Sequence, residues 1–197
     1  LYCPNLESKP DERMKFCNQC GEALAIKIPQ GDDRERFVCP ACATVHYVNP
    51  KIITGCIPTY ENSILLCRRA IEPAYGLWTL PAGFLEQGES IAEGAQRESY
   101  EEARANLTID ELYAIYDVTH IGQVHVFFRA TLQDLHFQPG PESLETQLFL
   151  EEEIPWQQLA FPVTTLVLRS FFDDRRNNLY TLRTATIDRN FRKLMES

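Results

Sequence analysis

The chain has 197 residues, 44% of them hydrophobic, and a formal net charge of −9. This apolar content excludes wholesale disorder and allows one domain of ordinary size with a small appendage. No apolar run reaches about 18 residues, which argues against a membrane-spanning helix, and the acidic balance argues against a protein that grips a nucleic-acid backbone.

The chain begins with a polar stretch that we assign to a weakly structured tail, residues 1–14. This stretch has no apolar core of a signal peptide, so we expect a cytoplasmic location. Glu7, Asp11 and Glu12 also do not suit a transit peptide.

Residues 15–48 form the first predicted unit, built on two Cys-x-x-Cys pairs that are 18 residues apart. The pairs are Cys17 with Cys20 and Cys39 with Cys42. This spacing is typical of a four-thiolate zinc ribbon, in which a hairpin separates the two pairs. Four thiolates close the coordination shell, so we predict a structural Zn²⁺; a redox role for the cysteines is the less favoured alternative.

The second predicted unit begins after the turn at Asn49 and Pro50 and mixes strands with helices without a regular repeat. In chain order we expect strands over 52–60 and 64–67, a loop and short strand over 76–84, a helix over 90–103, and strands over 107–118 and 124–132. A loop over 137–144, a short strand over 147–150, a helical turn over 155–159 and a final helix over 163–172 complete it. For residues 181–197 we expect a peripheral helix or a frayed tail.

The predicted helix over 90–103 carries three carboxylates on one side. A rotation of about 100° per residue places Glu98, Glu101 and Glu102 within an arc of about 100°. Carboxylates crowded in this way repel one another, and Mg²⁺ or Mn²⁺ would relieve the repulsion. An acidic helix face exposed to solvent is the ordinary alternative. The small residues Ala95 and Ala103 predict that a neighbouring stripe of this helix lies close to a sheet.

The residues before this helix favour the metal site over a solvated face. Gly83 is followed at fixed spacing by Glu89 and then by Arg97. Arg97 can hold the preceding loop by pairing with Glu89 or with a backbone carbonyl.

This pattern, from Gly83 to Glu102, resembles the signature of the Nudix hydrolase family. The resemblance implies an α+β fold, with an α/β/α sandwich and a mixed sheet over 49–175 and a C-terminal extension over 176–197. It implies that Glu98, Glu101 and Glu102 bind Mg²⁺ or Mn²⁺. It also implies that Gly83 offers its carbonyl to a metal and that Glu89 and Arg97 support the ligands.

The sequence departs from the family pattern at two positions of the helix. Ser99 replaces an aliphatic residue, and Arg104 replaces the glycine that ends the helix in a left-handed turn. We expect Asn106 to take over that conformation.

The zinc ribbon and further motifs resemble plant plastid FAD and ADP-ribose pyrophosphatases and their bacterial relatives. The motifs are Tyr47-x-Asn49-Pro50-Lys51, Leu65-Leu66-Cys67-x-Arg69, Gly76 to Gly83 and Pro139 to Glu145. The resemblance implies metal-dependent cleavage of the pyrophosphate of FAD, ADP-ribose or another dinucleotide or nucleotide sugar, releasing AMP, and a possible homodimer. NADH pyrophosphatases also carry a four-cysteine site, but their Pro/Phe-rich array after the helix is not found here.

Several residues outside the helix are candidates for substrate binding or catalysis. A general base is expected at one of the glutamates of the helix, at Glu142 or at Glu145, with Glu145 slightly favoured. Arg68 and Arg69 are candidates for phosphate or ribose contacts, with a solvated strand end as the alternative. Three aromatic residues, Tyr75, Trp78 and Phe84, are candidates for stacking on an adenine or flavin ring, although a core position is the more frequent outcome for each.

Two rival functions remain open. One is a ligand-sensing regulator whose zinc ribbon contacts nucleic acid, but residues 15–48 carry balanced charges and no basic stripe. The other is a hydrolase that removes damaged nucleoside triphosphates.

Overall fold

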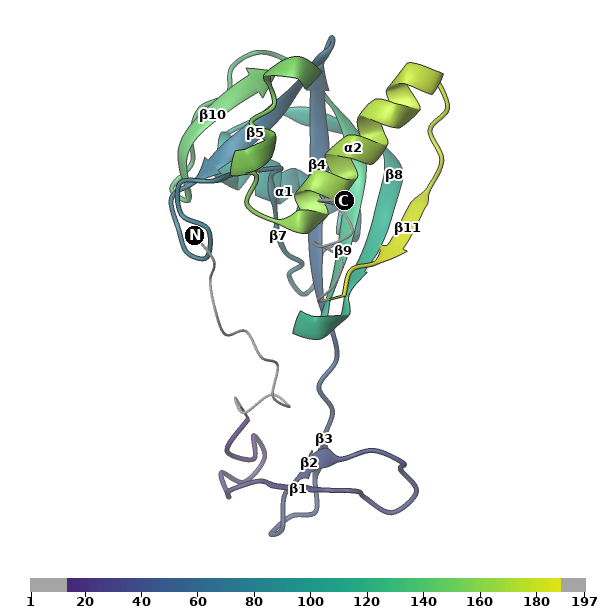
Figure 1. Cartoon of the computed structure of the whole chain (residues 1–197). Coiled ribbons are helices and arrows are strands. Elements are labelled where there is room, and N and C mark those ends of the chain that lie inside the picture. The colour runs from purple at the N-terminus through teal and green to yellow at the C-terminus, as the bar shows by residue number, and fades with distance from the viewer. Residues whose placement is uncertain (1–13, 189–197) are drawn as a thin grey trace. The chain divides into compact units, whose positions relative to one another are not determined.

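A computed structural model describes residues 14–188 (Figure 1). The chain divides into two compact units, residues 1–50 and residues 51–197. Among the described residues, no helix is long and apolar enough to cross a membrane.

The first unit is a three-stranded antiparallel sheet of very short strands. Its order is β1-β2-β3, with β1 Ala25–Lys27, β2 Arg36–Val38 and β3 Val45–His46. Its buried residues are Cys17, Val38, Cys39 and His46. Because so few buried side chains cannot stabilise a fold alone, a bound metal has a physical purpose here.

The second unit is built around one mixed sheet of eight strands. The path runs β10-β5-β4-β9-β8-β11, while β6 pairs with β5 and β7 pairs with β4. The pairs β4·β9 and β8·β11 are parallel, and the other pairs are antiparallel. The strands are β4 Lys51–Tyr60, β5 Ser63–Arg69, β6 Trp78–Thr79, β7 Ala82–Phe84, β8 Leu107–Val118, β9 Gln123–Leu132, β10 Ser143–Phe149 and β11 Arg183–Thr186.

Two helices cover opposite faces of this sheet (Figure 1). They are α1 Ile91–Ala103 and α2 Pro162–Asn177; the short helices η1 Thr119–Ile121, η2 Glu151–Glu153 and η3 Trp156–Gln158 lie in the connections. Side chains alternate across β5, with Ile64 and Leu66 in the core under α2 and Leu65 and Cys67 in the core under α1. The predicted α/β/α sandwich with a mixed sheet is therefore confirmed.

The end of the described chain differs from the prediction of a peripheral helix or a frayed tail. β11 pairs with β8 in parallel and extends the sheet. Asp174 on α2, which is 2% exposed, accepts hydrogen bonds from Tyr113 Oη (2.8 Å) and from the Arg183 guanidinium. This buried carboxylate links β11 to α2 through Arg183 and links α2 to β8 through Tyr113, contacts that the weak pattern of residues 183–186 does not predict. Residues 189–197 of the predicted tail, like residues 1–13, lie outside the described residues.

Candidate active site

Helix α1 begins where the sequence predicts, because its first turn is capped by side chains. Glu93 N donates to Ser90 Oγ at 3.2 Å, and Ser90 N donates to Glu93 Oε2 at 2.7 Å. This reciprocal capping box satisfies backbone donors that a helix start leaves free. It sets the start of the helix that carries the glutamates.

Arg97 joins the loop before α1 to the carboxylates on α1. It donates to Glu89 Oε1 at 2.8 Å and to the carbonyl of Phe84 at 3.0 Å. The same guanidinium reaches Glu98 Oε1 at 2.8 Å and Glu101 Oε2 at 3.1 Å. The predicted pairing of Arg97 with Glu89 is thus present, and the hydrogen bond from Arg97 lowers the pKa of Glu89 to about 2.

The three glutamates of α1 do not share one environment. Glu98 and Glu102 are 9% and 7% exposed, whereas the side chain of Glu101 is 54% exposed. Within residues 14–188, the buried Glu102 Oε2 has no hydrogen-bond partner. A lone buried carboxylate oxygen is costly, which points to a cation as its partner.

Gly83 lies directly against the Glu98 carboxylate. A Cβ atom at this position would come within 2.4 Å of the carboxylate carbon and of both oxygens. Only glycine therefore allows β7 to approach the carboxylate so closely. The backbone of Gly83 is at the cluster, where the family resemblance places a carbonyl ligand.

The raised pKa values of two glutamates in the cluster are those expected of a site that binds a cation. Burial and the charge of Glu98 together raise the pKa of Glu102 to about 8, although the charge of Arg69 opposes them. Burial also raises the pKa of Glu98. Two carboxylates that resist ionisation together are an oxygen-rich site suited to a hard divalent cation.

The other charged candidate residues differ in their contacts and in their electrostatic effect on this cluster. The charge of Glu142 raises the pKa of both Glu98 and Glu102. Glu145 lies opposite Arg68 in the β5–β10 pair, with 3.6 Å between Glu145 Oε2 and an Arg68 guanidinium nitrogen. Arg69 donates to the carbonyl of Pro73 at 2.9 Å.

The aromatic candidate Trp78 lies in the core. It is 6% exposed and makes an edge-to-face contact with Phe149, with ring centroids 4.9 Å apart. Its buried ring offers no open face to a substrate, so we correct its assignment from substrate binding to packing. Tyr75 and Phe84 are 57% and 49% exposed.

The C-terminal end of α1 differs from the sequence prediction at one residue. Arg104 itself is left-handed, with φ 50° and ψ 25°, so the expected role of Asn106 as the left-handed residue is wrong. The Arg104 backbone N–H donates to the carbonyls of Ser99 and Tyr100, which ends the helix as a glycine there would.

The loop from Gln138 to Glu142 packs on this end of the helix, a contact that was not predicted from the sequence. Gly140 N donates to the carbonyl of Glu102 at 2.9 Å, and Gln138 N donates to that of Ala103 at 2.9 Å. A Cβ atom on Gly140 would lie 1.7 Å from the carbonyl oxygen of Glu101. A glycine between two prolines is the sequence signal that could have indicated this close approach.

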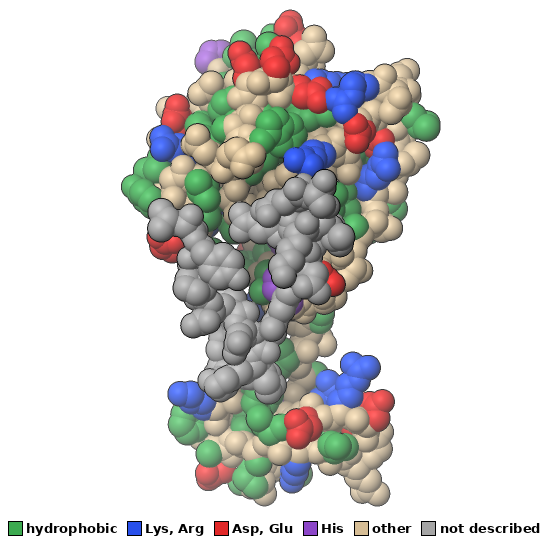
Figure 2. All heavy atoms as spheres, in the orientation of Figure 1, with side chains coloured by type: hydrophobic (Ala, Val, Ile, Leu, Met, Phe, Trp, Pro, Cys, Tyr) green, Lys and Arg blue, Asp and Glu red, His purple; other side chains and the backbone are tan. Residues whose placement is uncertain are grey.

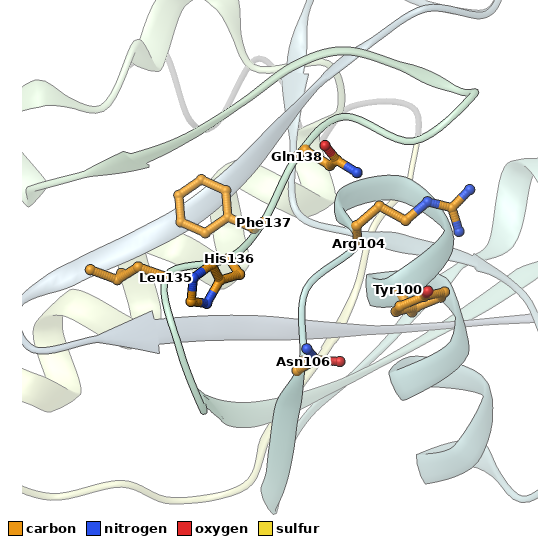
Figure 3. Close-up of a pocket in the computed structure, with 7 residues that line it drawn as sticks. All are labelled: Tyr100, Arg104, Asn106, Leu135, His136, Phe137 and Gln138. Carbon is orange, nitrogen blue, oxygen red and sulfur yellow. The ribbon is translucent and has the colours of Figure 1, made fainter.

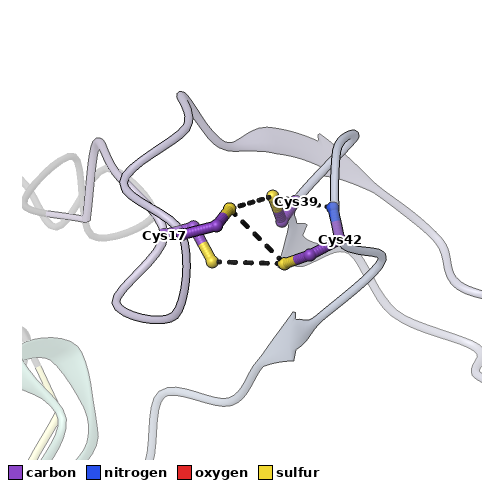
Figure 4. A group of neighbouring side chains, drawn as sticks. Cys17, Cys39 and Cys42 are labelled. Carbon is purple, nitrogen blue, oxygen red and sulfur yellow. Dashed lines mark hydrogen bonds between the residues drawn. The ribbon is translucent and has the colours of Figure 1, made fainter.

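The four predicted zinc ligands come together in the first unit (Figure 4). All four Sγ atoms lie within 4.8 Å of one another, and the pairs Cys17–Cys42, Cys20–Cys39 and Cys20–Cys42 are 3.6, 3.4 and 3.5 Å apart. Tetrahedral Zn–S bonds of about 2.3 Å imply sulfur atoms about 3.8 Å apart. The cluster therefore fits a structural zinc ion.

Comparison with known families agrees with this architecture. Residues 15–48 match the zinc-ribbon model described as the Nudix N-terminal domain, and residues 50–171 match the NUDIX domain model. The second match covers more than half of the chain, so the chain belongs to the Nudix family.

Individual relatives place the chain more narrowly. A NUDIX hydrolase from Nitrosomonas europaea is 50% identical, with a TM-score of 0.84 over 88% of this chain and 100% of that chain. The NAD-capped RNA hydrolase NudC of Haemophilus influenzae (strain PittGG) is 33% identical over 90 residues, which are 45% of this chain and 33% of that protein. The NudC of Photobacterium profundum is 27% identical over 71% of this chain and 51% of that protein. The chain thus spans a third to a half of the length of these curated relatives.

A more distant structure shares the fold. An ADP-ribose pyrophosphatase from Streptococcus suis is 22% identical, with a TM-score of 0.55 over 70% of this chain and 100% of that chain.

Proposed function

We propose that this protein is a metal-dependent pyrophosphohydrolase that cleaves the pyrophosphate of a dinucleotide such as FAD or ADP-ribose and releases AMP. The observation that carries this proposal is the buried pair Glu98 and Glu102 beside Gly83, in which Glu102 Oε2 has no partner among the described residues. Family membership supports the same reaction class.

Glu98 and Glu102 would hold Mg²⁺ or Mn²⁺, with Glu101 and the Gly83 carbonyl as further ligands. A bound divalent cation would supply charge neutralisation on the pyrophosphate and a lower pKa for the attacking water. Arg97 holds Glu98 and Glu101 in place through the 2.8 Å and 3.1 Å contacts. The exposed Glu101 faces the side from which a substrate and its ion would enter.

A second carboxylate outside α1 would take a proton from the attacking water. Glu142 and Glu145 remain the two candidates, and the electrostatic effect of Glu142 on Glu98 and Glu102 favours Glu142. Glu145 is paired with Arg68 at 3.6 Å, which engages it in the β5–β10 strand pair. Arg68 and Arg69 would contact substrate phosphate or ribose from the adjacent strand.

The substrate class is supported by the comparisons and by the sequence motifs. NAD-capped RNA hydrolases and an ADP-ribose pyrophosphatase all take their names from substrates that contain a dinucleotide or nucleotide-sugar pyrophosphate. NADH is therefore the second candidate beside FAD and ADP-ribose. A nucleoside triphosphate is the third.

One assay tests the proposal. The purified protein is incubated with Mg²⁺ or Mn²⁺ and with FAD, ADP-ribose, NADH or a nucleoside triphosphate, and the products are separated by chromatography. AMP formed from a dinucleotide is the expected result. An absence of turnover with every substrate and both metals would contradict it.

A matched pair of variants tests the metal ligands. Glu102→Gln keeps the size of the buried side chain and removes its charge, so we expect activity to fall by at least about 10²-fold with the fold retained. Glu152→Gln, on the solvent-facing η2, should change nothing. Full activity of Glu102→Gln would show that this residue does not hold the ion.

The rival function, nucleic-acid binding by a regulator, has less support. On the face shown in Figure 2, basic and acidic side chains are interspersed in each unit. Salt-sensitive retention on DNA or RNA, without turnover of any nucleotide, would favour that rival.

A further inference from the structure

A pocket beside the carboxylate cluster has no role in the proposed hydrolysis. It has a volume of about 500 Å³ and lies between the last turn of α1 and the loop at residues 135–138 (Figure 3). This volume is within the range of sites that take small molecules. None of its lining residues is acidic, although the chain as a whole carries a net charge of −9.

The wall on α1 is an arginine stacked on a tyrosine. The Arg104 guanidinium carbon lies 5.1 Å from the centre of the Tyr100 ring, and the tyrosine is 51% exposed. Figure 3 shows both side chains on the same side of the helix end. A planar guanidinium and an exposed aromatic ring are the two surfaces on which nucleotide rings stack in proteins.

The opposite wall is polar and held in place. Gln138 N donates to the carbonyl of Ala103 at 2.9 Å, and His136 N donates to Asp134 Oδ1 at 2.7 Å. The side chains of Asn106 and His136 lie against the Asp134 carboxylate, at 3.5 Å and 3.4 Å, and the Gln138 side chain adds a donor and an acceptor for the edge of a ring.

The backbone of Arg104 gives a second, independent indication. Its φ of 50° is one that L side chains rarely adopt, and glycine would adopt it without strain. The family pattern has glycine at this position, so the arginine is kept at an energetic cost. Strain retained beside an active site is often tied to function.

The pocket lies at the C-terminal end of the helix that carries the proposed metal ligands. Tyr100 directly precedes Glu101 in α1, and Arg104 is the C-cap residue of the same helix. The loop that lines the pocket continues to Glu142, whose charge acts on Glu98 and Glu102. Short stretches of chain therefore connect both walls of the pocket to residues of the carboxylate cluster.

We propose that this pocket binds the planar ring of one mononucleotide half of the substrate, stacked on the Arg104–Tyr100 pair. The proposal rests on the proposed function for its substrate class. The ring comes either from the adenylate half or from the half that departs with the other phosphate, and the probes AMP and FMN distinguish these two sources.

Direct binding tests the pocket without the reaction. AMP and FMN each contain a ring and one phosphate but no pyrophosphate, so neither is a substrate of the proposed reaction. We expect the wild-type protein to bind one of them, measured by calorimetry and, for FMN, by quenching of flavin fluorescence. Tyr100→Ala and Arg104→Gly should each raise the dissociation constant about 10-fold, since loss of one stacking partner has an effect of this order.

Two control variants make the result specific. Tyr100→Phe keeps the ring and should bind as the wild type does. Tyr47→Ala removes a tyrosine that is equally paired with an arginine, Arg36 at 5.2 Å, but lies in the other unit, and it should bind unchanged. No binding of either probe by the wild type, or equal affinity in all variants, would overturn the pocket assignment.

The same variants separate this proposal from the proposed function. If the protein binds AMP or FMN in a way that depends on Tyr100 but hydrolyses no dinucleotide, the pocket assignment stands and the proposed reaction is wrong. If the protein hydrolyses a dinucleotide and neither Tyr100→Ala nor Arg104→Gly changes the KM, the proposed reaction stands and the pocket assignment is wrong.

Discussion

Single residues decide the character of the carboxylate cluster. Glu98 and Glu102 are buried against β7, whereas Glu101, on the same helix, faces solvent. Helical spacing alone places all three on one side, so it does not distinguish them. The distinction depends on Gly83, which lets the backbone of β7 reach the Glu98 carboxylate.

This contact makes Gly83→Ala a sharp test. The added methyl group would overlap the Glu98 carboxylate at 2.4 Å, and Arg97 restrains that carboxylate from the other side. We expect kcat/KM to fall about 10²-fold, because a displacement of about 1 Å in an active site can have this effect. Thermal unfolding followed by circular dichroism should show that the variant still folds; normal activity in a folded variant would contradict the prediction.

His125 in β9 predicts a pH dependence of stability. Burial lowers its pKa to about 4, Nε2 bonds to Gln123 Oε1 at 2.9 Å, and Nδ1 is buried without a partner among residues 14–188. The folded state favours the neutral ring, and the unfolded chain gains a proton near pH 6.5. The stabilisation is therefore complete above pH 6.5 and is lost as the pH falls towards 4.

Urea unfolding of the wild type and of His125→Gln measures this effect. Between pH 7.5 and pH 5.0, the wild type should lose about 2 kcal/mol more free energy of unfolding than the variant does. The difference between the two proteins is needed because Glu102, with a raised pKa, acts in the opposite direction. Identical pH profiles would show that His125 is not held neutral.

At the scale of elements, segments with a strong sequence pattern adopt the predicted structure, whereas weakly patterned segments differ from the prediction. The capping residues and small-residue stripe of α1 and the long apolar runs of β4, β8 and β9 predict their own structures. β10 begins at Ser143, earlier than the predicted short strand, and α2 extends beyond the predicted helix to Asn177. Pairing with β5 recruits the polar start of β10, which has no strand signal of its own.

β11 depends on one buried carboxylate. Although burial opposes ionisation of Asp174, hydrogen bonds from Arg183 and Tyr113 lower its pKa. Asp174→Ala leaves the Tyr113 hydroxyl unpaired and the 41% exposed Arg183 without its partner, so we expect a loss of about 1–3 kcal/mol in stability with faster amide exchange in β11. Hydrogen exchange measured by mass spectrometry provides both readouts.

The neighbouring Asp173 is the matched control for this change. Its side chain is 62% exposed and pairs with Arg176 at the surface, so Asp173→Ala should cost less than about 1 kcal/mol. Equal effects of the two substitutions would show that burial of Asp174 is not what anchors β11.

At the scale of the whole molecule, the two units have different sources of stability. The second unit has two hydrophobic cores, one on each face of its sheet. The first unit has few buried residues and leaves Phe16, Ile26 and Ile28 more than half exposed. Its fold should therefore depend on metal binding, and that of the second unit should not.

Removal of zinc tests this division. Chelation, or Cys39→Ser, should unfold residues 15–48 and leave the second unit folded. Limited proteolysis followed by mass spectrometry would locate new cleavage sites between Lys15 and Val48, and metal analysis should find one zinc ion per untreated chain. Resistance of these residues to proteolysis after complete zinc loss would contradict the prediction.

The homodimer expected by resemblance stays a prediction at this scale.

The chemistry of both candidate sites is predictable from the sequence. The two cysteine pairs and the residues from Gly83 to Glu102 predict metal ligands because their spacing within a knuckle or a helix fixes their geometry locally. Only the tertiary structure decided which of these ligands are buried, that Trp78 is a core residue, that Arg104 ends α1, and that β11 joins the sheet. The end of α1 at Arg104 depends on backbone bonds within the last turn, whereas the other features depend on contacts between segments far apart in the chain, which no local periodicity encodes.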